Sequence, residues 1–174
     1  MTREVYLVRH ARCEKSGTLL GQADVALTAE GIAQAQALAD WFASRGVERV
    51  ISSDLRRAVE TASRIAEPLE ITLEVDARLR EISYGDWDGR TWEEIEKADP
   101  AAARRKLQDW NGWTPPGGEP FAQFIARVTA AWESIRASSA KVTVVVAHRG
   151  VNAVLLGDLM GFQQDYTTAR RLTL

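Results

Sequence analysis

The chain has 174 residues, which is enough for one domain with a substantial hydrophobic core. Hydrophobic residues make up 45% and charged residues 26%, as in soluble globular proteins, and a net charge of −2 argues against a nucleic-acid partner. The sequence shows neither an apolar signal region nor a run long enough to span a bilayer, so we expect no membrane partner and a cytoplasmic location. The single cysteine, Cys13, excludes an internal disulfide, and with only two histidines we expect neither a metal centre nor another cofactor.

The first part of the chain predicts strands that alternate with helices. Short apolar runs indicate strands at 5–8, 47–51 and 71–75. Apolar residues at helical spacing, with Thr28 as the N-cap and Gly46 at the end, predict the first helix. A second helix is expected at 55–66, capped by Ser52-Ser53-Asp54. This alternation favours a parallel sheet.

Residues 82–120 are rich in Gly, Pro, Asp and Trp, and we interpret them as a lid-like excursion over the end of the sheet. Short helices are expected at 92–97 and around 101–110. The segment holds four of the six tryptophans, namely Trp87, Trp92, Trp110 and Trp113. They either line a pocket for an apolar substrate or pack a small subdomain, and we expect packing.

The rest of the chain returns to the alternating pattern. An amphipathic helix is predicted at 120–136, followed by an apolar strand at 142–147 and a helix at 150–160. The element order predicts an α/β fold, a three-layer α/β/α sandwich with a mainly parallel central sheet. We expect residues 1–174 to form one domain that includes the excursion.

The two histidines lie at equivalent places in this scheme. His10 ends the first predicted strand, His148 ends the last, and arginines adjoin them as Arg9 and Arg149. Ligands of open α/β sheets bind at the carboxyl ends of the strands. Either histidine alone is explained by a hydrogen bond to the backbone, but two with adjacent arginines indicate a site for an anion.

Two further segments carry suitable chemistry. Arg56 and Arg57 stand where a strand end passes into a helix N-terminus, which favours anions, although both could be solvated charges of the first turn. Glu81 follows a strand and precedes a Gly turn, so from spacing alone it is equally a general acid or a surface ion-pair partner.

Six motifs carry a resemblance that extends over residues 5–156. They are Arg9-His10-Ala11, the loop from Leu20 through Gly21 to Gly31, Ser52-Ser53-Asp54-Leu55-Arg56-Arg57-Ala58, Leu79-Arg80-Glu81-Ile82, Pro116-Gly117-Gly118-Glu119 and Val145-Val146-Ala147-His148. In this order they resemble the histidine phosphatase superfamily, also called the phosphoglycerate mutase-like family. The resemblance implies a phosphoglycerate mutase-like fold.

The resemblance also implies an activity, that of a metal-independent phosphomonoesterase. His10 would attack phosphorus and form a phosphohistidine, while Glu81 protonates the leaving alkoxide and later activates water. The phosphoryl oxygens would be held by Arg9, Arg57 and His148. We add Gly21 and Arg149 as candidate phosphate- or substrate-binding residues.

The short chain and the loop after His10 resemble the α-ribazole phosphatases of cobalamin synthesis. The expected partner is a small phosphorylated metabolite, α-ribazole phosphate among others, with inorganic phosphate as product. Sugar phosphates, nucleotides and phosphohistidine proteins stay open as substrates. The alternatives are a phosphoglycerate mutase-type phosphotransferase and a weakly catalytic phosphate-binding protein. A monomer and a homodimer are both compatible with the sequence.

The chain departs from the family pattern next to both histidines. Ala11 replaces a usual glycine, Arg12 and Cys13 stand where many members have Glu-Thr or Glu-Ser, Ser16 stands where many have Asn, and Arg149 replaces a common glycine. We expect Arg12 and Arg149 to be solvated, with contact to a second anionic group of the substrate as the alternative. Many members also continue past the position of Leu174 into a further strand.

Overall fold

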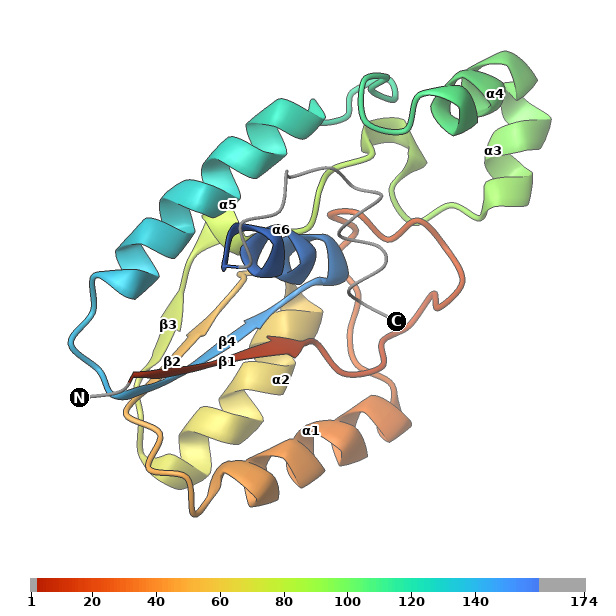
Figure 1. Cartoon of the computed structure of the whole chain (residues 1–174). Coiled ribbons are helices and arrows are strands. Elements are labelled where there is room, and N and C mark those ends of the chain that lie inside the picture. The colour runs from red at the N-terminus through yellow and green to blue at the C-terminus, as the bar shows by residue number, and fades with distance from the viewer. Residues whose placement is uncertain (1–2, 160–174) are drawn as a thin grey trace.

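The computed structural model describes residues 3–159 and shows strands and helices in alternating order (Figure 1). The strands are β1 (Glu4–Arg9), β2 (Arg49–Ser52), β3 (Leu73–Val75) and β4 (Val142–Ala147). The α-helices are α1 (Ala29–Phe42), α2 (Arg56–Ala66), α3 (Trp92–Ala98), α4 (Pro100–Gln108), α5 (Phe121–Arg136) and α6 (Arg149–Leu159). Short 3-10 turns are η1 (Glu67–Leu69), η2 (Ala77–Leu79) and η3 (Gly85–Trp87).

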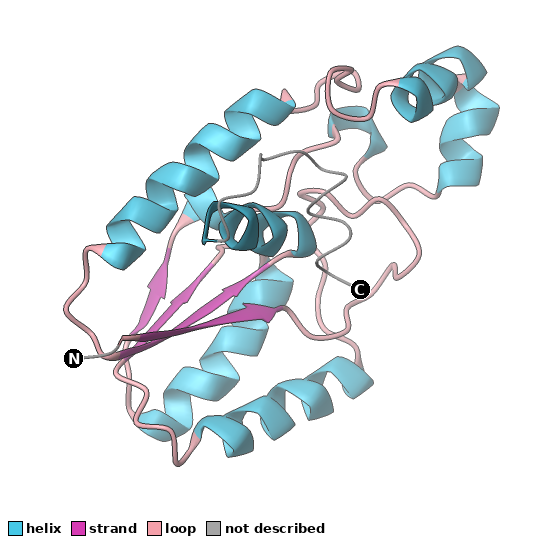
Figure 2. Cartoon of the chain, viewed as in Figure 1, coloured by secondary structure: helices cyan, strands magenta, loops and turns pink. Residues whose placement is uncertain are grey.

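Within this part of the chain the strands form one parallel sheet in the order β1-β4-β2-β3. Helices α1 and α2 cover one face and α5 and α6 cover the other, which confirms the three-layer α/β/α sandwich (Figures 1 and 2). Because β1 and β4 are direct neighbours with Arg9 opposite Ala147, the residues that follow them, His10 and His148, emerge together.

The core follows from the alternation of side chains along the strands. In β4, Val144 and Val146 pack with α2, whereas Val145 and Ala147 face the cluster that contains α5 and α6. All four side chains are fully buried, as expected for a central strand covered on both faces. The sheet is therefore a rigid base for the residues at its carboxyl edge.

The first helix begins as predicted, because the Thr28 hydroxyl accepts a hydrogen bond from Gly31 N at 3.1 Å. The predicted cap of α2 is wrong. Its N-cap is Leu55 with no side-chain hydrogen bond, because the Asp54 carboxylate binds the Arg80 guanidinium at 2.7 and 2.5 Å. The third strand is also shorter than predicted, 73–75 instead of 71–75.

The excursion between β3 and α5 lies at the end of the sheet toward which the strand arrows point (Figure 2). Its tryptophans contact one another, with ring centroids 5.4 Å apart for Trp87 and Trp113, and 6.3 Å apart for Trp92 and Trp110. The buried Lys106 ammonium donates to the carbonyls of Trp110 and Trp113. Packing of a subdomain, the expected role, is what these contacts provide.

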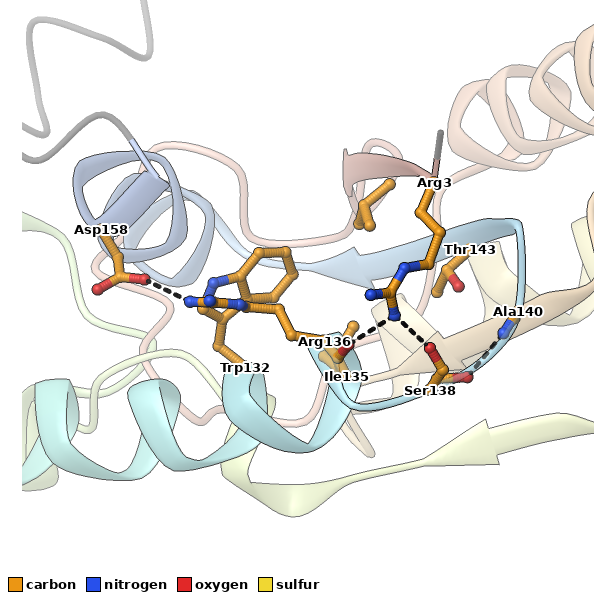
Figure 3. Close-up of a pocket in the computed structure, with 9 residues that line it drawn as sticks. Arg3, Trp132, Ile135, Arg136, Ser138, Ala140, Thr143 and Asp158 are labelled. Atoms are coloured by element: carbon orange, nitrogen blue, oxygen red, sulfur yellow. Dashed lines mark hydrogen bonds and ion pairs between the residues drawn. The ribbon is translucent and has the colours of Figure 1, made fainter. Parts of the chain in front are cut away.

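The opposite edge of the sheet, where the strands begin, has a pocket of its own (Figure 3). Arg3 donates to the carbonyls of Arg136 and Ser138, and Arg136 lies 3.8 Å from the Asp158 carboxylate. No helix within residues 3–159 has the length and apolar character that crossing a bilayer requires. The predicted Met160 end of the last helix and the residues up to Leu174 lie outside the described part.

Candidate active site

His10 immediately follows β1, and 8% of its surface is exposed. Its Nδ1 lies 2.8 Å from the carbonyl oxygen of Ala11, which can only accept, so Nδ1 carries the proton and Nε2 keeps its lone pair. Burial, with the charges of Arg57 and Arg9, lowers the pKa of His10 to about 4. The imidazole is thus neutral near pH 7 and has a free nitrogen, which is what a nucleophile needs.

His148 follows β4, and its ring centroid lies 5.3 Å from that of His10. Its Nε2 lies 2.9 Å from the Ser53 hydroxyl, and its Nδ1 is buried without a partner. Burial, supported by the Arg57 charge, lowers the pKa of His148 well below its usual value. A neutral imidazole with an unpaired nitrogen can donate one hydrogen bond to a ligand oxygen.

Arg57, in the first turn of α2, is 1% exposed, so it is not a solvated charge. It donates to the carbonyls of Gly21 at 2.8 Å and Ala23 at 2.7 Å, and its Nε is buried without a partner. Gly21 has φ +45°, and a Cβ there would lie 1.7 Å from Asp88 Oδ1, so glycine is required. The loop thereby fixes the guanidinium beside His10.

The N-terminus of α2 is already neutralised by the protein. Arg56 N donates to the Asp24 carboxylate at 2.8 Å, and the Arg56 side chain pairs with Glu60 at 2.7 Å. The helix dipole is therefore satisfied by Asp24, which sequence reasoning did not identify. Of the two adjacent arginines, Arg57 faces the site and Arg56 faces solvent.

Glu81 accepts backbone hydrogen bonds from Ile82 N and Gly150 N, both at 3.0 Å. A Cβ at Gly150 would lie 2.3 Å from Glu81 Oε1, so the glycine permits this close approach. Burial raises the pKa of Glu81 against the opposing effect of these hydrogen bonds. A carboxyl group with a raised pKa that lines the same pocket as His10 is suited to proton donation.

Arg127 holds the chain segment that carries Glu81, a role that the sequence did not reveal. Its guanidinium donates to the carbonyls of Arg78, Arg80 and Glu81 and pairs with Glu119 at 2.6 Å. The signal available in the sequence is a charge on the apolar side of α5, between Phe124 and Val128. Such a position requires a buried or half-buried partner.

Asp88 connects the excursion to the loop around Gly21. Its carboxylate accepts from Tyr84 N at 2.8 Å within the excursion and from the backbone N–H of Gln22 in the loop. The backbone of the loop also pairs with the excursion, since Gly89 N donates to Leu19 O at 2.7 Å. The excursion therefore positions the loop that holds Arg57, and it contributes Tyr84 to the pocket lining.

These groups surround an inner pocket of about 210 Å³. Its lining residues are Arg9, His10, Thr18, Leu19, Leu20, Gly21, Arg57, Glu81, Tyr84, Arg149 and Gly150. Arg9 and Arg149 are exposed, whereas His148 is buried next to His10, with ring centroids 5.3 Å apart, and is not among the lining residues. The structure thus brings Arg9, His10, Gly21, Arg57, Glu81 and Arg149 together around one pocket with His148 next to it, whereas Arg56 lies outside.

The site is built for an anion held by arginine and imidazole donors. Within residues 3–159, no three His, Cys, Asp or Glu side chains are grouped closely enough to hold a metal ion. A neutral imidazole, a buried guanidinium and a carboxyl group of raised pKa can together perform nucleophilic displacement with acid assistance.

Comparisons with known proteins place this geometry in context. The family model described as histidine phosphatase superfamily (branch 1) matches residues 5–173. A glucosyl-3-phosphoglycerate phosphatase of Mycolicibacterium vanbaalenii is 35% identical, covering 94% of this chain and 76% of the relative. An adenosylcobalamin/alpha-ribazole phosphatase of Salmonella typhimurium is 30% identical, covering 90% and 79%.

Solved structures agree. The alpha-ribazole phosphatase from Shigella flexneri superposes with a TM-score of 0.86 at 28% identity, covering 91% of this chain and 80% of that one. Mycobacterial glucosyl-3-phosphoglycerate phosphatase superposes with a TM-score of 0.80 at 32% identity, covering 93% and 81%. Both likenesses extend over nearly the whole chain.

Proposed function

The chain belongs to the histidine phosphatase superfamily and is a phosphoric monoester hydrolase, and we propose that it acts without a metal through a phosphohistidine at His10. The substrate in this proposal is a small phosphorylated metabolite, and the product is inorganic phosphate.

One observation carries the proposal. Arg57 Nε and His148 Nδ1 are buried beside His10 and have no hydrogen-bond partner. A buried polar group without a partner destabilises the folded state by about 1–3 kcal/mol, so two such groups close together are typical of a ligand-binding site. A phosphoryl group bound at His10 would offer oxygens to both.

In the first step, the lone pair of His10 Nε2 attacks phosphorus, and the bond from phosphorus to the ester oxygen breaks. The Glu81 carboxyl group gives its proton to the departing alkoxide, which leaves as an alcohol. The Ala11 carbonyl keeps the proton on His10 Nδ1 and stabilises the positive charge of the phosphorylated ring.

In the second step, water attacks the phosphohistidine, and the Glu81 carboxylate takes its proton. The bond from phosphorus to Nε2 breaks, so phosphate leaves and His10 and Glu81 return to their starting states. Throughout, the buried Arg57 and His148, together with the exposed Arg9, stabilise the charge on the phosphoryl oxygens, and this stabilisation supplies most of the rate enhancement.

The named relatives suggest two substrates to try first. One is α-ribazole phosphate, named for the phosphatase of Salmonella typhimurium, and the other is glucosyl-3-phosphoglycerate, named for that of Mycolicibacterium vanbaalenii. Their leaving groups differ, since the first contains an aromatic base and the second a carboxylate.

Phosphate release should be measured with a chelator present, on these two esters, sugar phosphates, nucleotides and 3-phosphoglycerate, for wild type and His10→Ala. We expect metal-independent release by the wild type and none by the variant. Phosphate release that persists in the His10→Ala variant would overturn the proposal. Conversion of 3-phosphoglycerate to its isomer without phosphate release would instead identify a mutase.

A further inference from the structure

A second, outer pocket of about 450 Å³ adjoins the inner pocket. The two share Arg9, His10, Thr18 and Leu20, so the outer pocket opens directly beside the nucleophile. Its other polar side chains come from Arg12, Ser16 and Gln34. A leaving group that extends from the inner pocket into the outer pocket meets hydroxyl, amide and guanidinium groups.

Tryptophans do not line either pocket within the described residues. Trp87, Trp92, Trp110 and Trp113 pack against one another and against the core cluster of α5 and α6. An aromatic leaving group would find no aromatic stacking partner among the residues of the outer pocket. The described lining suits a hydroxylated, charged leaving group better than an aromatic one.

Arg12 is held firmly by its backbone at the rim of the outer pocket. Its N–H donates to Gln34 Oε1 at 2.9 Å, and its carbonyl accepts from Thr28 N at 3.0 Å. Helix α1 approaches so closely that a Cβ at Gly31 would lie 1.9 Å from the Arg12 carbonyl oxygen. The guanidinium therefore extends from a fixed base, which reduces the entropy lost on binding an anion.

The charge of Arg12 is available for exchange. Its side chain is 55% exposed and pairs at 2.8 Å with Glu30, which is 57% exposed. Such solvated pairs contribute little to stability, so an anion of the substrate can replace Glu30. Arg9 is exposed at the junction of the two pockets, and it adds a second positive charge in a chain whose net charge is −2.

We propose that Arg12 is a specificity-determining residue that selects esters whose leaving group carries a second negative charge, bound in the outer pocket. This inference rests on the proposed phosphatase function. It names the substrate class of that site as phosphate esters of hydroxylated acids or of sugars with a further phosphate.

The test uses matched substrates that differ by one anionic group. 3-Phosphoglycerate is compared with glycerol 3-phosphate, and glucose 1,6-bisphosphate with glucose 6-phosphate. The wild type should prefer the charged member of at least one pair, and raised ionic strength should reduce the preference. Arg12→Gln should reduce this ratio of kcat/KM about five-fold, chiefly through KM, and Arg12→Lys should retain most of it.

Arg136→Gln is the matched control, since Arg136 is 53% exposed, pairs with carboxylates and lies at the opposite edge of the sheet (Figure 3). It should leave both ratios unchanged. The inference is overturned if the wild type shows kcat/KM ratios near one for both substrate pairs, or if Arg12→Gln leaves these ratios unaltered, while His10-dependent hydrolysis of nitrophenyl phosphate is still observed. If the wild type does not hydrolyse nitrophenyl phosphate in a His10-dependent way, the proposed function itself is overturned.

Discussion

The carboxyl edge of the sheet and the excursion at 82–120 both bury charged or polar groups, but they treat them differently. At the edge, Arg57 Nε and His148 Nδ1 lack partners and lie beside the buried His10. In the excursion, the buried Lys106 ammonium is held by two carbonyls, and a single amide oxygen, that of Asn111, is unpaired. Unpaired donors grouped around a nucleophile indicate a ligand site, whereas a cation held by two backbone carbonyls indicates a structural role.

The largest loss of activity is expected from a substitution of Arg57, whose Nε is one of the unpaired groups beside His10. Arg57→Met should reduce kcat/KM for nitrophenyl phosphate by about 10²- to 10³-fold, because a buried donor to the phosphoryl group is lost. Circular dichroism should show that the variant is folded, and Arg57→Lys controls for charge alone. A kcat/KM within ten-fold of the wild-type value would mean that the unpaired Arg57 Nε does not contribute to catalysis.

Glu81→Gln should have a large effect that depends on the leaving group. Alkyl phosphates need a proton on the departing oxygen, so their turnover should fall about 10²-fold or more. Nitrophenyl phosphate has a good leaving group and should lose much less in single-turnover measurements of the first step. Equal losses on both substrates would remove Glu81 from the role of general acid.

The pH dependence should follow the shifted pKa values of the free enzyme. His10 must be neutral to attack, so kcat/KM should fall below about pH 4, after correction for the ionisation of the substrate. For alkyl phosphates it should also fall as pH rises through the raised pKa of Glu81, because the carboxyl group loses its proton. An acidic limb at the ordinary histidine pKa would show that burial does not keep His10 neutral.

The smallest effect on catalysis should come from the excursion. Lys106→Met keeps most of the packing but leaves the carbonyls of Trp110 and Trp113 without their donor. The free energy of unfolding, measured by denaturant titration, should fall by about 1–3 kcal/mol. Turnover of nitrophenyl phosphate should stay within two-fold of wild type. A large loss of turnover with unchanged stability would show that Lys106 contributes to catalysis and not only to the packing of the excursion.

The sequence was sufficient to predict the sheet and the meeting of its two histidines. Apolar strands that end in His10 and His148, in an alternating α/β order, leave few alternatives, and parallel neighbours place their ends together. The burial of Arg57 could not be predicted from its helix position alone, because that depends on the Gly21 carbonyl from a distant loop.

Contacts between distant segments explain the other misses. Asp54 has the side chain of an N-cap, but Arg80 binds it and Asp24 takes over at the start of α2. Arg127 supports the Glu81 segment through three carbonyls, which no local pattern encodes. Backbone carbonyls are present at every residue, so a sequence cannot show which of them an arginine will reach.

The most direct measurement is intact mass spectrometry of the enzyme quenched at neutral pH during turnover of nitrophenyl phosphate, followed by peptide mapping. We expect a transient species that is heavier by one phosphoryl group, that carries this group on His10 and that is absent from His10→Ala. Glu81→Gln should not abolish this species. Turnover without a phosphorylated species on a rapid-quench timescale, or phosphorylation at another residue, would show that His10 is not the nucleophile.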